Sequence, residues 1–229
     1  MIANNYHDKQ HNLKNFILIL NNLDIIGPFI ALAAFFLRRK RITGELRGIF
    51  IFCLIQFVLN FTSTYLDLVF KANNYWVYKL NTILSVIVIL IIFGKYLLPD
   101  IKKLTNWIIL ALIAINILST FFGDGVTYYN SYSASLVSFV IVGYCLYYFY
   151  SKLLMSSPED SVPSTPIFWC IVGLFTYFAG AFFIFISYKY MIEADIATIG
   201  TLWRFHNLLL VICCLYIGYG ILCKTYQMT

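Results

Sequence analysis

Charged residues are scarce in this chain. Only 11% of its 229 residues are Asp, Glu, Lys or Arg, whereas 61% are hydrophobic and 19% are aromatic. An ordinary soluble domain is about one quarter charged and about half apolar. The shortage of charge therefore excludes a soluble globular protein and predicts an integral membrane protein. The longest polar connection, SSPEDSVPSTP, is too short to hold a soluble catalytic or DNA-binding domain.

Histidine is also scarce, with three in the chain, and only His206 lies in a hydrophobic run. An intramembrane zinc hydrolase needs several convergent ligands, and bis-histidine haem needs two histidines. The last hydrophobic run has no lysine before Lys224, at its end, so it cannot form a retinal Schiff base in its middle. The sequence thus predicts no cofactor, no metal and no enzyme. A membrane hydrolase that uses the carboxylates of Asp24 and Asp67 remains an alternative.

Cysteine is absent from the predicted outer loops, where oxidation could pair it. All six cysteines lie in or at the ends of apolar runs, which excludes a disulfide framework and favours a packing role. They are Cys53, Cys145, Cys170, Cys213, Cys214 and Cys223.

Long hydrophobic runs occupy most of the chain. About 20 apolar residues are needed to cross a hydrocarbon core of about 30 Å. Seven runs meet this length, and they leave no room for a second domain, so residues 1–229 are predicted to form one all-α seven-transmembrane-helix bundle. The runs lie near residues 16–37, 48–70, 77–97, 105–123, 133–155, 167–190 and 199–223.

The basic residues predict the orientation. The segment LRRKRITGELR after the first run carries five basic residues, and the connection after the third run adds Lys95, Lys102 and Lys103. Loops rich in Lys and Arg remain in the cytoplasm. We therefore expect the N-terminus outside and the C-terminus in the cytoplasm. The net charge of +6 is explained by topology and by contact with membrane lipids, and no nucleic-acid partner is predicted.

Polar side chains gather on the outer side of the predicted bundle. Ionisable residues inside a membrane need a partner, water or a function. Gln56, Asn60 and Asp67 recur at spacings that place them on one helix face. The candidate ligand-binding residues are Asp24, Gln56, Asn60, Asp67, Lys79, Asn81, Trp203, Arg204, His206 and Asn207.

Three interpretations of these groups remain open at this point. Asp67 could pair with Lys79, and Asp24 with Arg204, in which case the charges would only hold helices together. The groups could instead line a polar outer cavity that binds a ligand, or belong to an ion or proton path. The number of polar groups exceeds what two ion pairs require, which favours a cavity.

Two segments near the end of the chain resemble a known group. PIFWCIVGLFTYFAG and LWRFHNLLLVICCLYIGYGILC are similar to the last two helices of small seven-helix inner-membrane proteins of Bacteroidota. The resemblance rests there on Pro166, Phe168, Trp169, Tyr177, Phe178, Gly180, Trp203 and His206. In NNYWVYKLNT it rests on Trp76, Tyr78 and Thr82.

The chain departs from that group at three positions: Lys79 replaces a histidine, Ser85 an acidic residue and Ala181 an asparagine. These changes put any shared acid chemistry in doubt. The resemblance implies a multi-pass protein of the bacterial inner (cytoplasmic) membrane. It also implies a sensor kinase as a possible partner, since genes of the group often accompany such kinases.

The sequence as a whole favours a membrane receptor or sensory protein. We expect it to bind a small polar or anionic ligand, or a lipid headgroup, in an outward-facing cavity. The alternatives are a transporter or oligomeric channel subunit, and a structural membrane scaffold.

Overall fold

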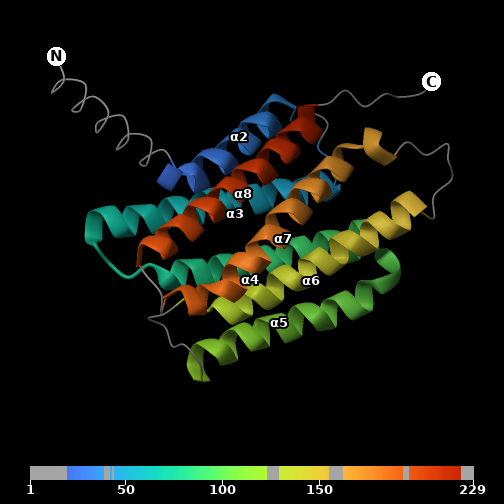
Figure 1. Ribbon diagram of the computed structural model, residues 1–229. Coiled ribbons are helices and arrows are strands. Elements are labelled where there is room, and N and C mark those ends of the chain that lie inside the picture. Colours follow the sequence, from blue (N-terminus) through green and yellow to red (C-terminus); the bar gives the residue numbers. More distant parts are fainter. Residues whose placement is uncertain are drawn as a thin grey trace, which may run out of the picture.

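The computed structural model describes residues 20–38, 42, 44–122, 129–154, 162–192 and 196–222. Across these ranges the chain forms helices joined by short connections, and it contains no strand. The long helices run side by side in one bundle (Figure 1). The long helices are α2 (Leu23–Leu37), α3 (Gly44–Tyr65), α4 (Tyr75–Ile92), α5 (Lys102–Phe122), α6 (Ser131–Phe149), α7 (Pro166–Ile192) and α8 (Ile196–Leu222).

Short helical segments extend or precede several of these helices. A π-helical turn continues α3, α4 and α6 at their ends, and a 3₁₀ turn precedes α5 and α7. The segments are η2 (Leu66–Phe70), η3 (Phe93–Leu97), η4 (Pro99–Ile101), η5 (Tyr150–Leu154) and η6 (Val162–Ser164).

Six helical spans within the described residues are long and apolar enough to cross a membrane, so the chain is a multi-pass membrane protein. They are Gly44–Phe70, Tyr75–Leu97, Pro99–Phe122, Ser131–Leu154, Pro166–Tyr188 and Ile199–Leu222. The seventh expected crossing corresponds to α2, an apolar helix whose 15 residues are fewer than the usual span. The first residues of that expected run, 16–19, lie outside the described residues.

Most helices begin a few residues earlier than their hydrophobic runs. α3 begins at Gly44 rather than near residue 48, with Glu45 in its first turn, where a negative charge favours the helix dipole. The fourth run was expected from residue 105, but its helical turns begin at Pro99, a residue suited to a first turn. Hydropathy misses these turns because their residues are polar.

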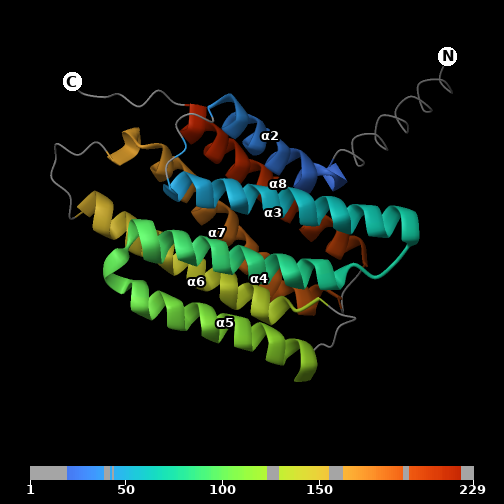
Figure 2. The same ribbon diagram turned by 180° about the vertical axis from the view of Figure 1, so that it is seen from behind.

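The helices follow one another around the bundle. α6, α7 and α8 lie in front in Figure 1, and α3 and α4 lie in front in Figure 2, seen from behind. α2 packs against both α3 and α8, which closes the ring, while α5 lies at the opposite edge against α4 and α6.

The outside of the bundle is strongly apolar. Phe36, Trp107, Phe121 and Phe122 are among many large hydrophobic side chains that remain exposed. Such a surface suits contact with lipid tails rather than water.

Inside the bundle the helices pack against one another through aliphatic, aromatic and cysteine side chains. The packing role predicted for cysteine is confirmed at five positions, since Cys53, Cys145, Cys170, Cys213 and Cys214 are free and buried in the core. The sixth, Cys223, lies outside the described residues.

Candidate ligand cavity

A cavity of about 440 Å³ lies at the end of the bundle where α3 and η2 lead into α4, on the left in Figure 1. We call it the polar cavity, because Asn, Asp, Ser, Thr and Arg side chains form most of its wall. Its lining comes from the start of α2, the end of α3, η2, the start of α4 and the start of α8. Eight of the ten candidate residues line it: Asp24, Asn60, Asp67, Asn81, Trp203, Arg204, His206 and Asn207.

Asp24 is the buried carboxyl of the polar cavity. Its side chain is only 8% exposed, and its Oδ1 atom has no hydrogen-bond partner among the described residues. A buried polar atom without a partner costs free energy, so this oxygen needs water or a ligand.

Asn60 holds the helix turn that carries Asp24. Its Nδ2 atom donates a hydrogen bond of 3.0 Å to the backbone oxygen of Asp24. In an ideal helix that oxygen would accept from residue 28, but Pro28 has no backbone N–H. α3 therefore supplies the donor that α2 lacks, as neighbouring helices do for prolines within membranes.

Arg204 contacts the amide of Asn21 rather than the carboxylate of Asp24. Its Nε atom donates to Asn21 Oδ1 at 3.3 Å, and Asn207 Nδ2 donates to the backbone oxygen of Asn21 at 3.4 Å. No ion pair joins Arg204 to Asp24 among the described residues, so the structure does not show the pairing that was one of the three open alternatives. The guanidinium thus lies on the cavity wall with a neutral neighbour, and its charge can act on a guest.

Lys79 does not line the polar cavity. It is buried on a different face of α4, about 100° around the helix from Tyr78, which does line the cavity. Asp67, by contrast, is exposed at the cavity rim. The helical phase of α4 thus places Lys79 on another face than the cavity-lining Tyr78.

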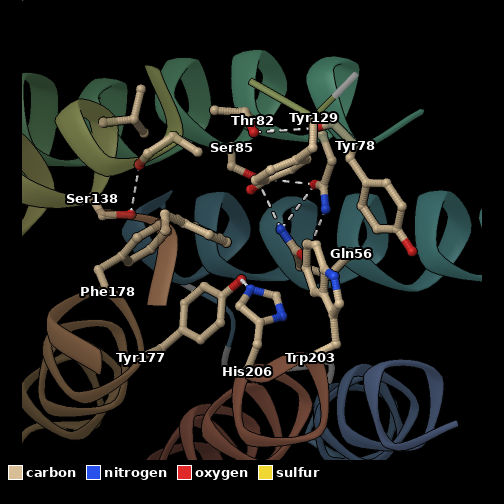
Figure 3. Close-up of a pocket in the computed structure, with 14 residues that line it drawn as sticks. Gln56, Tyr78, Thr82, Ser85, Tyr129, Ser138, Tyr177, Phe178, Trp203 and His206 are labelled. Atoms are coloured by element: carbon tan, nitrogen blue, oxygen red, sulfur yellow. Dashed lines mark hydrogen bonds between the residues drawn. The ribbon is translucent and has the colours of Figure 1, made fainter. Parts of the chain in front are cut away.

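His206 lies where the polar cavity meets a smaller one. Its Nε2 atom is 2.9 Å from the hydroxyl oxygen of Tyr177, while its buried Nδ1 atom has no partner among the described residues. The rings of Tyr177, Phe185 and Trp203 surround it at centroid distances of 5.2 to 5.4 Å. These contacts fix the imidazole in place (Figure 3).

The smaller cavity, which we call the inner recess, has a volume of about 40 Å³ and is lined by Gln56 among others. This is room for one or a few water molecules. Gln56 and Asn81 exchange side-chain hydrogen bonds of 3.0 and 3.1 Å, and Gln56 also donates to Ser85 at 2.8 Å (Figure 3). Gln56 therefore does not line the polar cavity, but it holds Asn81, which does.

Aromatic residues close one side of both cavities. Trp203 stacks on Tyr78 at 5.5 Å and contacts the rings of Tyr129 and Tyr188 at 5.3 and 5.9 Å. Burial raises the pKa of Tyr129 well above its ordinary value, because the phenolate would lose its water. Tyr129 therefore stays neutral, and this wall adds no charge.

An apolar layer lies beyond the inner recess. Phe52, Ile89, Ile141 and Leu174 are fully buried there, and they come from α3, α4, α6 and α7. These residues lie about one helical turn beyond Gln56, Ser85, Ser138 and Phe178, which line the inner recess.

Several contributors to the site were not among the sequence candidates. Asn74 belongs to a short connection, and Asn21 lies in the helical residues just before α2; neither gives a periodic signal. Tyr177 gave no sign that it reaches His206. Six residues that carry the resemblance line the inner recess: Tyr78, Thr82, Tyr177, Phe178, Trp203 and His206.

The cavity can bind and orient a small guest through a guanidinium, two carboxyls and several amides. No protein-family model, curated protein or solved structure matches the chain.

Proposed function

We propose that the protein is a receptor of the bacterial inner membrane that binds a small polar ligand bearing an anionic group in the polar cavity. The anionic group lies against Arg204 and Asn207, and occupancy shifts the bundle between two conformations. A ligand can shift such an equilibrium only through different affinities for the two states.

The observation that carries this proposal is the incomplete pairing around the cavity. Within the described residues, Asp24 Oδ1 and His206 Nδ1 lack partners, and Arg204 bonds to a neutral amide. A scaffold in which the charges only hold helices together would pair them with one another. The volume of about 440 Å³ is within the range of about 300–1,000 Å³ for small-molecule sites.

We further propose seven crossings, with α2 as the first, and an N-terminus outside. Six described basic residues lie at or near the end opposite the cavity: Arg38, Arg47, Lys95, Lys102, Lys103 and Lys152. If the positive-inside rule holds, that end is cytoplasmic and the polar cavity opens outward.

The apolar layer beyond the inner recess favours reception over transport. A transporter needs a polar path to the other side in at least one state, and this layer interrupts it here. A receptor needs only that its far end change shape, for example against a sensor kinase in the same membrane.

The test is ligand-dependent thermal unfolding of the purified protein with a panel of small carboxylates, phosphate monoesters and amino acids. A ligand at ten times its Kd stabilises the folded state by about 1.4 kcal/mol. We expect stabilisation in the unmodified protein and in Arg47→Gln, an exposed arginine at the other end, but not in Arg204→Gln.

Two results would reject the proposal. If no panel member stabilises the unmodified protein, or if Arg204→Gln is stabilised equally, the cavity is not a receptor site of this kind. Accumulation of the stabilising ligand inside proteoliposomes would show transport instead.

A further inference from the structure

Among the described residues, the charges on the wall of the polar cavity are unequal in number. Asp24, Asp67 and Arg204 line it, so two described carboxyls face one guanidinium. Lys79, which would have balanced them, lies on another face of α4. A purely anionic guest would satisfy Arg204 but would add negative charge beside two carboxyls, which is unfavourable at low dielectric.

Among the described residues, the positive and negative side chains of the cavity wall do not pair with one another. Arg204 is turned toward Asn21, and no ion pair joins it to either carboxyl among the described residues. Asp24 is more than nine-tenths buried, and its Oδ1 atom accepts no hydrogen bond there. Asp67 is exposed at the rim of the same cavity. A buried carboxylate of this kind requires a donor, and a cationic donor forms the stronger bond.

We infer that the ligand is a small zwitterion, with an ammonium group that binds Asp24 and an acidic group that binds Arg204. This deepens the proposed function and rests on it, because the acidic group is the one already assigned to Arg204. The ammonium donates to the free oxygen of Asp24, and Asp67 adds attraction at the entrance.

Two sources could supply this chemistry: a free amino acid from outside the cell or the headgroup of an ethanolamine phospholipid. Both carry an ammonium a few bonds from a carboxylate or phosphate. The proposal concerns the shared pattern of charges, and the experiment distinguishes the sources.

The test compares probes that differ only in the amine. Thermal unfolding and calorimetric titration are carried out with each of the 20 common amino acids and its N-acetyl derivative, and with phosphoethanolamine and ethyl phosphate. We expect at least one amine-bearing probe to bind at least about tenfold more tightly than its partner without the charge. Asp24→Asn should remove that difference, whereas Asp100→Asn, an exposed carboxyl at the other end, should keep it.

The lipid source is tested with nanodiscs of phosphatidylethanolamine or phosphatidylglycerol. Higher stability in the ethanolamine lipid that Asp24→Asn abolishes identifies the headgroup, and soluble amino acids should then compete weakly. A free amino acid that binds equally in both lipids identifies the soluble source. Because Asp67 is exposed, Asp67→Asn should fold even if Asp24→Asn does not, and it should weaken binding of the amine-bearing probe alone.

The inference and the proposed function fail separately. If probes with and without the amine bind equally, and binding still needs Arg204, the zwitterion is wrong and the anion receptor stands. If no probe in the panel or lipid disc stabilises the protein, both are wrong.

Discussion

The side chain of Asn60 donates a 3.0 Å hydrogen bond to the backbone oxygen of Asp24, the oxygen that Pro28 leaves without its helical donor. This bond links α3 to α2 at the wall of the polar cavity. It also fixes the helix turn on which the buried Asp24 carboxyl stands, so the same contact serves stability and the geometry of the site.

Asn60→Ala should therefore destabilise the protein by about 1–3 kcal/mol, because it leaves a buried carbonyl without a partner. Pro28→Ala restores a backbone N–H to α2, so the cost of Asn60→Ala should be smaller in the Pro28→Ala background. Unfolding of the two single variants and the double variant in detergent measures this coupling. Additive effects would mean that the bond to Asp24 does not explain the role of Asn60.

The reciprocal amide pair of Gln56 and Asn81 should also be coupled. Gln56→Leu leaves Asn81 Oδ1 and Nδ2 without their Gln56 partners, and the expected cost is about 1–2 kcal/mol. The double variant with Asn81→Leu should cost less than the sum, with a coupling of about 0.5–2 kcal/mol. A coupling of zero would mean that the bonds between Gln56 and Asn81 do not stabilise the cavity wall.

Close packing of α7 on α8 depends on Gly173. A Cβ atom there would lie 2.8 Å from the backbone oxygen of Cys213. This oxygen belongs to the backbone of the neighbouring helix α8 and cannot easily move aside. We expect Gly173→Ala to destabilise by about 1–3 kcal/mol. Gly143→Ala on α6 is the matched control, since nothing lies within 4 Å of its Cβ position, and it should change stability by less than about 0.5 kcal/mol. Equal effects of the two substitutions would contradict the packing of α7 against α8.

Thiol labelling can test the orientation of the bundle in the membrane. Five of the native cysteines are buried, so in a Cys223→Ser background only an introduced thiol should react quickly. A membrane-impermeant maleimide should label Ala72→Cys, exposed at the cavity end, in intact cells. It should label Asp100→Cys only after the membrane is opened. The reverse pattern would place the cavity on the cytoplasmic side.

Hydrophobic length was enough to predict an all-helical membrane protein and the approximate position of six spans. Depth within the runs was enough to identify most residues of the polar cavity, because polar side chains at the same helix ends must meet. Helical phase was harder to predict. Lys79 was expected to line the cavity, but it lies about 100° around α4 from Tyr78, the neighbouring residue that does line it.

The contacts of Asn21 could not have been predicted from the sequence either. Asn21 binds Arg204 and Asn207 through its side chain and its carbonyl, and neither bond has a sequence pattern. The link between Asn60 and Pro28 could have been suspected, since a proline inside a helix always leaves one carbonyl to be satisfied. Its partner on another helix depends on tertiary packing.

An experimental density map of the protein, purified gently from its native membrane, tests the central claim most directly. The account predicts density for a small polar molecule or headgroup in the polar cavity, within hydrogen-bond distance of the Arg204 guanidinium and of Asp24 Oδ1. A map in which Arg204 and Asp24 bind each other across a closed cavity would contradict it and leave these charges as a structural ion pair.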